Sequence, residues 1–434
     1  MEIIEDRMVW GIIRRTLSCV DPRLVDHGER VAYIALELLR SAGVDLNARK
    51  NAAVLVLCLL HDIGAYKTDE IDRMMEFESQ TVWEHSIYGA LYLKRLSPLS
   101  GGAEGVLYHH VGFKRLQEAG IEGKSLRLAD IIHLADRVDS VWKNELDFRS
   151  YLEPRRDRFF SIENVDLCLS AESRIREGLS SGRYGEELQN VVCRMHFSAQ
   201  ERRRFLEMLA LSIDFRSEFM VLHTITTVGA SIALARLLEI PEDSYSDLYY
   251  GALLHDIGKV STPVEILEKP GRLSPEEFEV MKKHVTETGK ILDGYVNPKA
   301  YRIAVRHHEK LDGSGYPLGL KAEDLSLEER VCAISDIVSA LVRRRSYKEA
   351  FDKEKTKRVL QEMADQGKIG RRGVKAVIDH YDDFMETIGH TGEKIMETYA
   401  SIRTDYQEML AVAKAGQIPS LPERKPLDSL FTFD

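Results

Sequence analysis

Two stretches of the sequence run through the same apolar residues into the same polar pair. CLLHDIGA covers residues 58–65 and ALLHDIGK covers residues 252–259. Aspartate is rarely buried unless it is paired or bound to a metal, so a His-Asp pair at the end of an apolar helix calls for a specific partner. A glycine, Gly64 or Gly258, follows each pair. We expect it to end the helix in a left-handed turn that leaves both polar groups facing inward.

Further histidines and aspartates extend this repeat through each half of the chain. In both halves a histidine precedes the His-Asp pair, and another histidine, a His-His pair and an aspartate follow it. The residues of the second half are His223, His255, Asp256, His284, His307, His308 and Asp336, and those of the first half are His27, His61, Asp62, His85, His109, His110 and Asp136. The sequence therefore predicts a duplicated metal-site scaffold.

Each set of residues has the composition of a two-metal site. The first histidine, the His-Asp pair and the last aspartate provide a His-His-Asp-Asp set for one divalent ion. The three other histidines provide ligands for a second ion, and the aspartate of the pair is placed to bridge the two. Imidazole-rich ligation favours Fe, Mn, Zn, Co or Ni over Mg or Ca. In the first half, the alternative is a decayed copy that keeps these residues for packing.

Helical periodicity dominates the rest of the chain, and no run of alternating, strand-like segments is present. Residues 30–43 carry one apolar stripe that stops at Gly43, and residues 274–294 begin with Ser274 as N-cap and Pro275 at the first helical position. We predict an all-α chain, with an N-terminal domain over 1–210, a second domain over 211–390, and a C-terminal helix and irregular tail over 391–434.

Bulk properties exclude some classes of protein. The net charge of −10 argues against a binder of polymeric nucleic acid, whose surface is basic. The five cysteines are scattered and mostly set in apolar runs, which is typical of reduced core residues in a cytoplasmic protein. The longest apolar runs are too short to span a bilayer, so we expect no membrane partner.

The second half resembles the HD-GYP subgroup of the HD phosphohydrolase superfamily, through HDIGK (255–259) and HHEKLDGSGYP (307–317). The first half resembles the broader HD superfamily only, so the fold implied is a tandem of HD-type helical domains. The resemblance implies hydrolysis of a bacterial cyclic dinucleotide, either cyclic di-GMP or 3'3'-cGMP-AMP, to a linear 5'-phosphorylated dinucleotide by a metal-bridging hydroxide. It also implies two transition-metal ions, with Fe or Mn favoured. The alternative is a catalytically weak cyclic-dinucleotide receptor that acts in signalling.

Individual roles follow from the same resemblance. Asp256 bridges the metals and Lys259 lies beside them, although a lysine at a helix end can also serve the helix dipole. Arg345 and Lys348 match residues that hold substrate phosphate; the alternative is a solvated basic face. Phe219 stands where three-metal members of the family carry a glutamate, with Glu218 one residue away, so we expect a binuclear centre.

The signature loop and the first half complete the comparison. Gly315, Tyr316 and Pro317 match the signature loop, in which Tyr316 stacks on a base or contacts a partner, either a second copy of the chain or another signalling protein; a plain surface turn is the alternative. The first half lacks the lysine, with Ala65 in its place, and carries Glu145 and Phe148 where the second half has Arg345 and Lys348. We predict that residues 1–200 bind metal without opening cyclic dinucleotides, and act as a regulatory partner or, as the second choice, as a nucleotidase.

Overall fold

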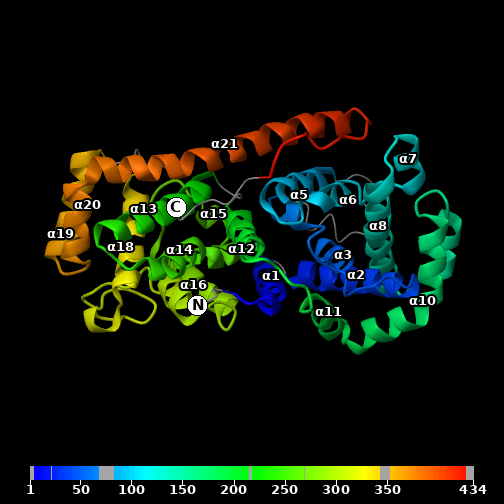
Figure 1. The fold of residues 1–434 in the computed structure, drawn as a ribbon, viewed down its shortest axis with the longest axis horizontal. Helices are drawn as coiled ribbons and strands as arrows, with labels where there is room; N and C mark the ends of the chain where they lie inside the picture. Colours follow the sequence, from blue (N-terminus) through cyan, green and yellow to red (C-terminus); the bar gives the residue numbers. More distant parts are fainter. Residues whose placement is uncertain are drawn as a thin grey trace. The chain divides into compact units, whose positions relative to one another are not determined.

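The computed structural model describes residues 4–20, 22–67, 83–214, 218–267, 269–342 and 352–426. These residues form helices joined by turns and loops, with no strand and two isolated β-bridges, Arg156↔Phe160 and Asp312↔Lys321. The prediction of an all-α fold is confirmed (Figure 1).

The chain forms two compact units. The N-terminal unit comprises Val20–Phe205 and Ala400–Asp428, and the C-terminal unit comprises Met1–Cys19 and Leu206–Tyr399. These compact units do not coincide with the ranges 1–210, 211–390 and 391–434. Met1–Cys19 belongs to the C-terminal unit, and Ala400–Asp428 belongs to the N-terminal unit.

The N-terminal unit is built around α2 (Pro22–Ser41), which packs against α3 (Arg49–Leu59), α8 (Gly123–Lys143) and α10 (Ile162–Ser181). Ile34 and Leu36 of α2 are fully buried. The other elements are η1 (Ile63–Lys67), α5 (Trp83–Leu96), η2 (Ser100–Gly102), α6 (Ala103–Leu107), α7 (Phe113–Glu118), α9 (Phe148–Leu152), η3 (Glu153–Arg155) and α11 (Tyr184–Val192). The helices that carry the repeated histidines and aspartates therefore form one packed group.

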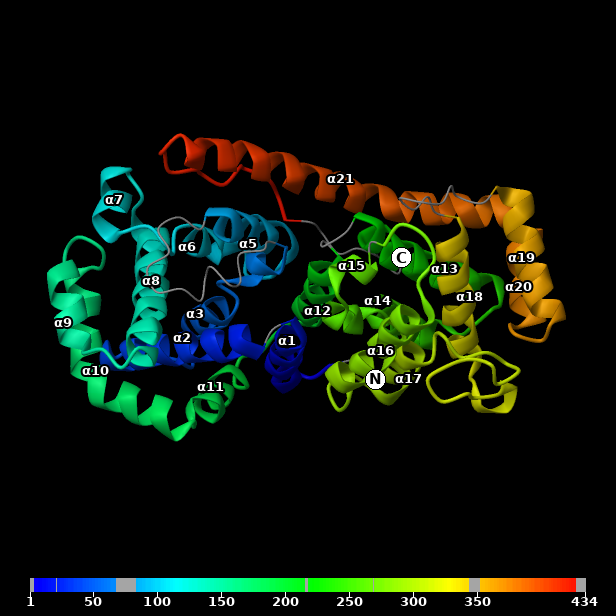
Figure 2. The same cartoon turned by 180° about the vertical axis from the view of Figure 1, so that it is seen from behind.

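The C-terminal unit repeats this arrangement around α13 (Glu218–Leu237), which packs against α14 (Tyr245–Leu254) and α18 (Leu327–Leu341), while α16 (Pro275–Leu292) packs against η5 (Ile257–Ser261) and α17 (Pro298–Val305). Figure 2 shows α13, α14, α16 and α18 from behind. The other elements are η4 (Glu242–Ser244), α15 (Val264–Leu267), η6 (Ala322–Asp324), α19 (Lys353–Asp365) and α20 (Arg371–Asp379). The division between the two units falls within α12 (Ala199–Asp214) and α21 (Tyr381–Lys414).

Local signals start the helices that carry the second set of polar residues. Ser274 is the N-cap of α16, as its sequence predicts, and accepts a hydrogen bond from the backbone N–H of Glu277. The Glu277 side chain accepts one from the N–H of Ser274, which completes a capping box. Ser326 and Glu329 form the same box at the start of α18. Both helices are therefore fixed at their first turn, ahead of His284 and Asp336.

The glycines after the two His-Asp pairs serve a different purpose from the one expected. Neither Gly64 nor Gly258 has the positive φ of a left-handed turn, so that prediction is wrong. A Cβ atom on Gly64 would lie 2.0 Å from the carbonyl oxygen of His85, and one on Gly258 would lie 2.0 Å from that of His284. Glycine is required because η1 and η5 approach the backbones of α5 and α16 this closely. This contact brings the third histidine of each set next to the His-Asp pair.

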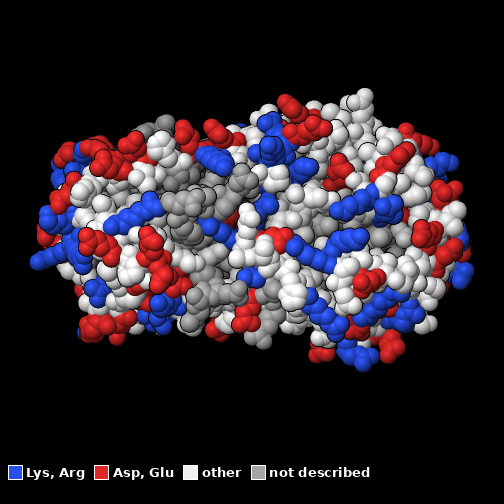
Figure 3. Space-filling view, viewed as in Figure 1, with Lys and Arg blue, Asp and Glu red and all other residues white. Residues whose placement is uncertain are grey.

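Among the described residues, one helix is long and apolar enough to cross a membrane, which the lengths of the apolar runs did not predict. The segment Met220–Leu237 of α13 meets that criterion, and 78% of it is buried inside the structure. Burial of this extent is typical of a core helix of a globular protein, so the segment is weak support for a membrane span. Acidic and basic side chains are interspersed over the face drawn in Figure 3, in keeping with the modest net charge.

The first helix, α1 (Asp6–Val20), belongs to the C-terminal unit although it begins the chain. Arg15 donates from Nη1 to the backbone oxygens of Lys290 (2.9 Å) and Asp293 (2.7 Å), and its guanidinium lies 4.3 Å from the ring centroid of Tyr295. A Cβ on Gly11 would lie 2.1 Å from the same ring. Helix α1 therefore caps the C-terminal end of α16, the helix that carries His284.

Candidate metal centres

The C-terminal unit brings all seven of its predicted ligands together. His223 comes from α13, His255 and Asp256 follow α14, His284 lies on α16, His307 and His308 follow α17, and Asp336 lies on α18. Two groups have ligand atoms within 4.8 Å of one another: His223, His255 and Asp256, and His284, His307 and His308. These are the two ligand groups that the sequence spacing predicts.

The two oxygens of Asp256 face different groups. Oδ2 lies 3.2 Å from Nε2 of His223 and 3.1 Å from Nε2 of His255, whereas Oδ1 lies 3.3 Å from Nε2 of His284. Asp336 closes the first group, with Oδ1 3.1 Å from Nε2 of His223. This is the arrangement that a bridging carboxylate requires.

Backbone carbonyls orient the imidazoles. Nδ1 of His255, His284 and His307 lies 2.7, 2.6 and 2.7 Å from the carbonyl oxygen three residues earlier. Nδ1 of His223 lies 2.9 Å from Oγ of Ser339, whose hydroxyl donates to the His223 carbonyl and so accepts from the ring. Each Nδ1 therefore carries the proton, and each Nε2 turns its lone pair into the site.

Burial keeps the imidazoles of His284, His307 and His308 neutral; we call these three residues the second histidine group. Burial lowers the pKa of His284 to about 4 and that of His308 to about 3. Burial would raise the pKa of Asp256, but the neighbouring His255 and Lys259 hold it well below its usual range. Neutral imidazoles beside ionised carboxylates are the protonation states that metal binding needs.

Unsatisfied atoms indicate that a cation fits here. Oδ1 of Asp256 is buried without a hydrogen-bond partner among the described residues. The Nε2 atoms of His284 and His307 lie 3.3 Å apart, and burial lowers the pKa of both imidazoles, so neither has a proton to offer there. Buried acceptors that face one another are costly unless a cation lies between them. The donor set, nitrogen-rich with two carboxylates, suits a transition metal.

Lys259 and the signature loop lie beside these ligands. Nζ of Lys259 lies 2.5 Å from Oδ2 of Asp256, so its charge is held against the bridging carboxylate. The ring of Tyr316 lies against that of His308, with centroids 4.8 Å apart, and Gly315 is required because a Cβ there would lie 2.4 Å from the backbone nitrogen of Lys310. Pro317 follows in the exposed part of the loop.

Some predicted residues cannot be placed. Arg345 and Lys348 lie outside the described residues, and the side chains of Glu218 and Phe219 are outside the described part of α13. Their roles remain predictions.

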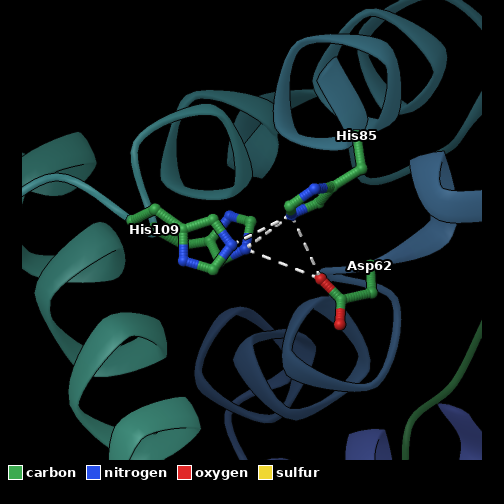
Figure 4. A group of neighbouring side chains, drawn as sticks. Asp62, His85 and His109 are labelled. Atoms are coloured by element: carbon green, nitrogen blue, oxygen red, sulfur yellow. Dashed lines mark hydrogen bonds and ion pairs between the residues drawn. The ribbon is translucent and has the colours of Figure 1, made fainter. Parts of the chain in front are cut away.

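The N-terminal unit repeats the arrangement around Asp62. Oδ2 of Asp62 lies 3.2 Å from Nε2 of His61 and 3.7 Å from that of His27, whereas Oδ1 lies 3.5 Å from Nε2 of His85 and 3.6 Å from that of His109. Figure 4 shows His85 and His109 pointing at this carboxylate from separate elements. Oδ1 of Asp62 and Nε2 of His61 are buried without hydrogen-bond partners among the described residues. This site therefore also fits a metal.

His110 and Asp136 complete the N-terminal set. His110 groups with Asp62, His85 and His109, and Oδ1 of Asp136 lies 3.3 Å from Nε2 of His27. The seven residues predicted from the sequence thus meet at one place in this unit as well.

The two sites differ in the groups around their ligands. In the N-terminal unit, Nδ1 of His27 lies 2.7 Å from Oδ2 of Asp139, and Arg30 donates to the same carboxylate. Burial alone would lower the pKa of His27, but its hydrogen bonds to Asp136 and Asp139 raise it to about 9. Metal binding at this site must displace that proton.

A partly buried guanidinium also distinguishes the N-terminal site. Arg137 donates to Oδ2 of Asp136 from Nη2 (2.7 Å) and Nε (3.1 Å). The sequence predicted no cation at this site, because the positions matching Lys259, Arg345 and Lys348 are Ala65, Glu145 and Phe148. Asp139 and Ser339, which occupy the third position after the last aspartate in the two halves, were not predicted either. That spacing, one helical turn from a ligand, was the available signal.

Comparison with known proteins agrees with this geometry. Two models of the HD domain match the chain, one over residues 24–140 and the other over residues 204–373. The chain is a tandem HD-domain protein. The second HD domain carries the HD-GYP signature residues, and the resemblance inferred from the sequence is confirmed.

The chain is similar to several cyclic dinucleotide phosphodiesterases. It is 26% identical over 401 residues to 3'3'-cGAMP-specific phosphodiesterase 1 of Vibrio cholerae, covering 88% of this chain and 93% of the relative. It is 36% identical over 162 residues to a cyclic di-GMP phosphodiesterase of Thermotoga maritima, covering 37% of this chain and 44% of that relative. The crystal structure of the V. cholerae cyclic GMP-AMP specific phosphodiesterase V-cGAP3 superposes with a TM-score of 0.55 at 17% identity, covering 88% of this chain and 98% of that one. This last likeness shows the fold.

Proposed function

We propose that the C-terminal HD domain hydrolyses a cyclic dinucleotide to a linear 5'-phosphorylated dinucleotide. The observation that carries the proposal is the two-sided Asp256, whose oxygens face His223 and His255 on one side and His284 on the other. The relatives named above act on 3'3'-cGAMP or on cyclic di-GMP, which supports this substrate class. Both dinucleotides are candidates.

We assign metal binding and phosphate stabilisation to different residues of this domain. His223, His255, His284, His307, His308, Asp256 and Asp336 would hold two divalent ions, with Fe or Mn favoured. When bound, such ions supply an activated water and stabilise charge on the phosphate. Lys259, held against Asp256, is placed to neutralise charge on the phosphate or to protonate the leaving O3'. Two ions are expected, because Phe219 offers no ligand atom.

For the N-terminal domain we propose metal binding without ring opening. Its ligands converge on Asp62 as their counterparts do on Asp256, but Ala65 stands in place of Lys259 and is buried. A regulatory role is the first choice, and removal of the 5'-phosphate from the linear product is the second.

We further propose that the protein acts in the cytoplasm. The buried cysteines Cys58, Cys168 and Cys332 are free thiols, which supports a reducing compartment. A partner, either a second copy or another signalling protein, would contact the loop that contains Gly315, Tyr316 and Pro317.

Product chromatography with Mn²⁺ or Fe²⁺ under reducing conditions tests the main proposal, with cyclic di-GMP, 3'3'-cGMP-AMP and cyclic di-AMP as substrates. Wild-type protein should form linear dinucleotide, and Asp256→Ala should form none while losing metal and retaining its helical circular dichroism. Asp365→Ala, which removes an exposed carboxylate of the same unit, is the matched control and should behave as wild type. Turnover in Asp256→Ala would overturn the proposal. Wild-type protein that binds the dinucleotide without product would favour the receptor alternative.

A further inference from the structure

An aromatic row leads from the second histidine group to the surface of the C-terminal domain. The rings of His308 and Tyr316 have centroids 4.8 Å apart, and Phe278 meets Tyr316 edge-on with centroids 6.3 Å apart and planes at 83°. Phe278 is 45% exposed, although most large apolar side chains of this domain are buried. An exposed aromatic ring that adjoins a polar site through a second ring is suited to stacking on a ligand.

The ammonium group of Lys282 lies over two rings of the same aromatic row. Nζ of Lys282 lies 5.5 Å from the ring centroid of Phe278 and 5.8 Å from that of Tyr316. Lys282 and Phe278 are four residues apart on α16 and therefore share a face of the helix. Lys282 also pairs with Glu279, at 2.6 Å from Oε1, so the ammonium is held near the rings while its other protons remain able to donate.

Both sides of the row are rigid. The capping box of Ser274 and Glu277 fixes the turn of α16 that carries Phe278. The buried Glu309 carboxylate accepts from the backbone N–H groups of Leu318 (2.7 Å) and Leu320 (2.9 Å), and the N–H of Tyr316 donates to the carbonyl of His308 at 3.3 Å. A surface that is already ordered before the ligand arrives loses little entropy on binding.

We infer that Phe278, Lys282 and Tyr316 form the surface on which the C-terminal domain receives one nucleobase of its substrate, and that this base is guanine. Stacking on Phe278 accepts any base, because every base has a π face. Lys282 would discriminate guanine from adenine. Its ammonium donates to the O6 and N7 acceptors of guanine, whereas adenine presents an amino donor in place of O6. The inference rests on the proposed function, since it assumes a cyclic dinucleotide at this site.

Two substitutions test the inference against matched controls. Phe278→Leu should raise KM for cyclic di-GMP by about tenfold, a typical loss for one stacking contact, with kcat within about twofold and metal content unchanged. The separate variant Phe278→Tyr should have the KM of the wild type, because the aromatic ring is kept. Leu327→Ala, at another exposed apolar side chain of this unit, should change neither constant.

A second variant and its matched control test the preference for guanine. Lys282→Met should lower the ratio of kcat/KM for cyclic di-GMP over cyclic di-AMP by about tenfold, as expected for one hydrogen bond to a charged donor. Lys290→Met, which removes the lysine of a comparable exposed pair with Glu287 on the same helix, should leave the ratio unchanged. An unchanged ratio in Lys282→Met overturns the assignment to guanine.

The outcomes separate this inference from the proposed function. If wild-type protein opens no cyclic dinucleotide, the proposed function fails whatever the variants do. If wild-type protein turns over and Phe278→Leu has an unchanged KM, or loses metal together with activity, only the stacking surface is overturned.

Discussion

Asp139 accepts the Nδ1 proton of His27 at 2.7 Å, and at the matching position of the C-terminal domain the hydroxyl of Ser339 accepts the Nδ1 proton of His223 at 2.9 Å. The same ligand is thus oriented by a carboxylate in one domain and by a neutral hydroxyl in the other. A carboxylate makes the imidazole a stronger ligand but also stabilises its protonated form.

Asp139→Ser gives the N-terminal site the neutral partner of its counterpart. We expect a loss of metal affinity of about tenfold to 100-fold, the usual cost of removing a group that orients a ligand. The measurement is metal competition against a chelator in an Asp256→Ala background, which isolates the N-terminal site. Undiminished affinity would show that Asp139 serves Arg30 and packing alone.

The raised pKa of His27 predicts a pH-dependent N-terminal site. In the metal-free state His27 keeps a proton up to about pH 9, so a metal ion must displace it below that pH. Mn²⁺ affinity of the Asp256→Ala protein should therefore rise between pH 7 and pH 9, by up to about tenfold per pH unit. An affinity that is flat over this range would contradict the prediction.

Gly258→Ala tests the close approach of η5 to α16. Its Cβ would lie 2.0 Å from the carbonyl oxygen of His284 and 2.4 Å from the backbone nitrogen of Thr288, and these backbone atoms cannot move aside cheaply. We expect a loss of about 1–3 kcal/mol in the free energy of unfolding, as for other overpacked sites, together with weaker metal binding. Gly389→Ala, with open space around the position, should leave both unchanged or stabilise the helix; a Gly258→Ala protein as stable as wild type would be the contrary result.

Asp62→Ala distinguishes the roles proposed for the N-terminal domain. A nucleotidase role predicts that the variant still makes linear dinucleotide but leaves its 5'-phosphate in place. A regulatory role predicts a changed rate of ring opening with the same product. Product analysis and elemental analysis decide between them, and if rate, product and metal content all match wild type, the domain is a packing scaffold.

Arg345 and Lys348 are predicted to bind substrate phosphate. Alanine at either position should raise KM more than it lowers kcat, because binding is lost in the ground state and the transition state alike. Steady-state kinetics on cyclic di-GMP provide the check. Equal falls in kcat and kcat/KM would instead assign these residues to stabilisation of the transition state.

The sequence was enough to predict which histidines and aspartates lie together, but not the groups that surround them. Each of these residues is a histidine or aspartate in an apolar helical setting, and repetition of the order argues against chance. Arg137 and Asp139 lie in the same helix as Asp136, yet a charged residue on a helix is usually solvated, and only the packing of α2 against α8 shows that Arg30, Asp139 and His27 are connected.

The fold, too, was predicted from the sequence only where the signals are local. Helix periodicity and capping residues predicted the class and the start of α16, because these are local signals. The reason for Gly258 was not local, since it depends on the carbonyl of His284, distant along the chain. The membership of α1 in the C-terminal unit depends likewise on its contact with Lys290, Asp293 and Tyr295.

The position of α1 means that the second HD domain cannot be excised by a single cut. A fragment beginning at residue 204, where the family match begins, would leave the ring of Tyr295 without its guanidinium and the carbonyls of Lys290 and Asp293 without their donor. An isolated C-terminal domain should therefore regain full thermal stability only when a peptide spanning residues 1–20 is added in trans.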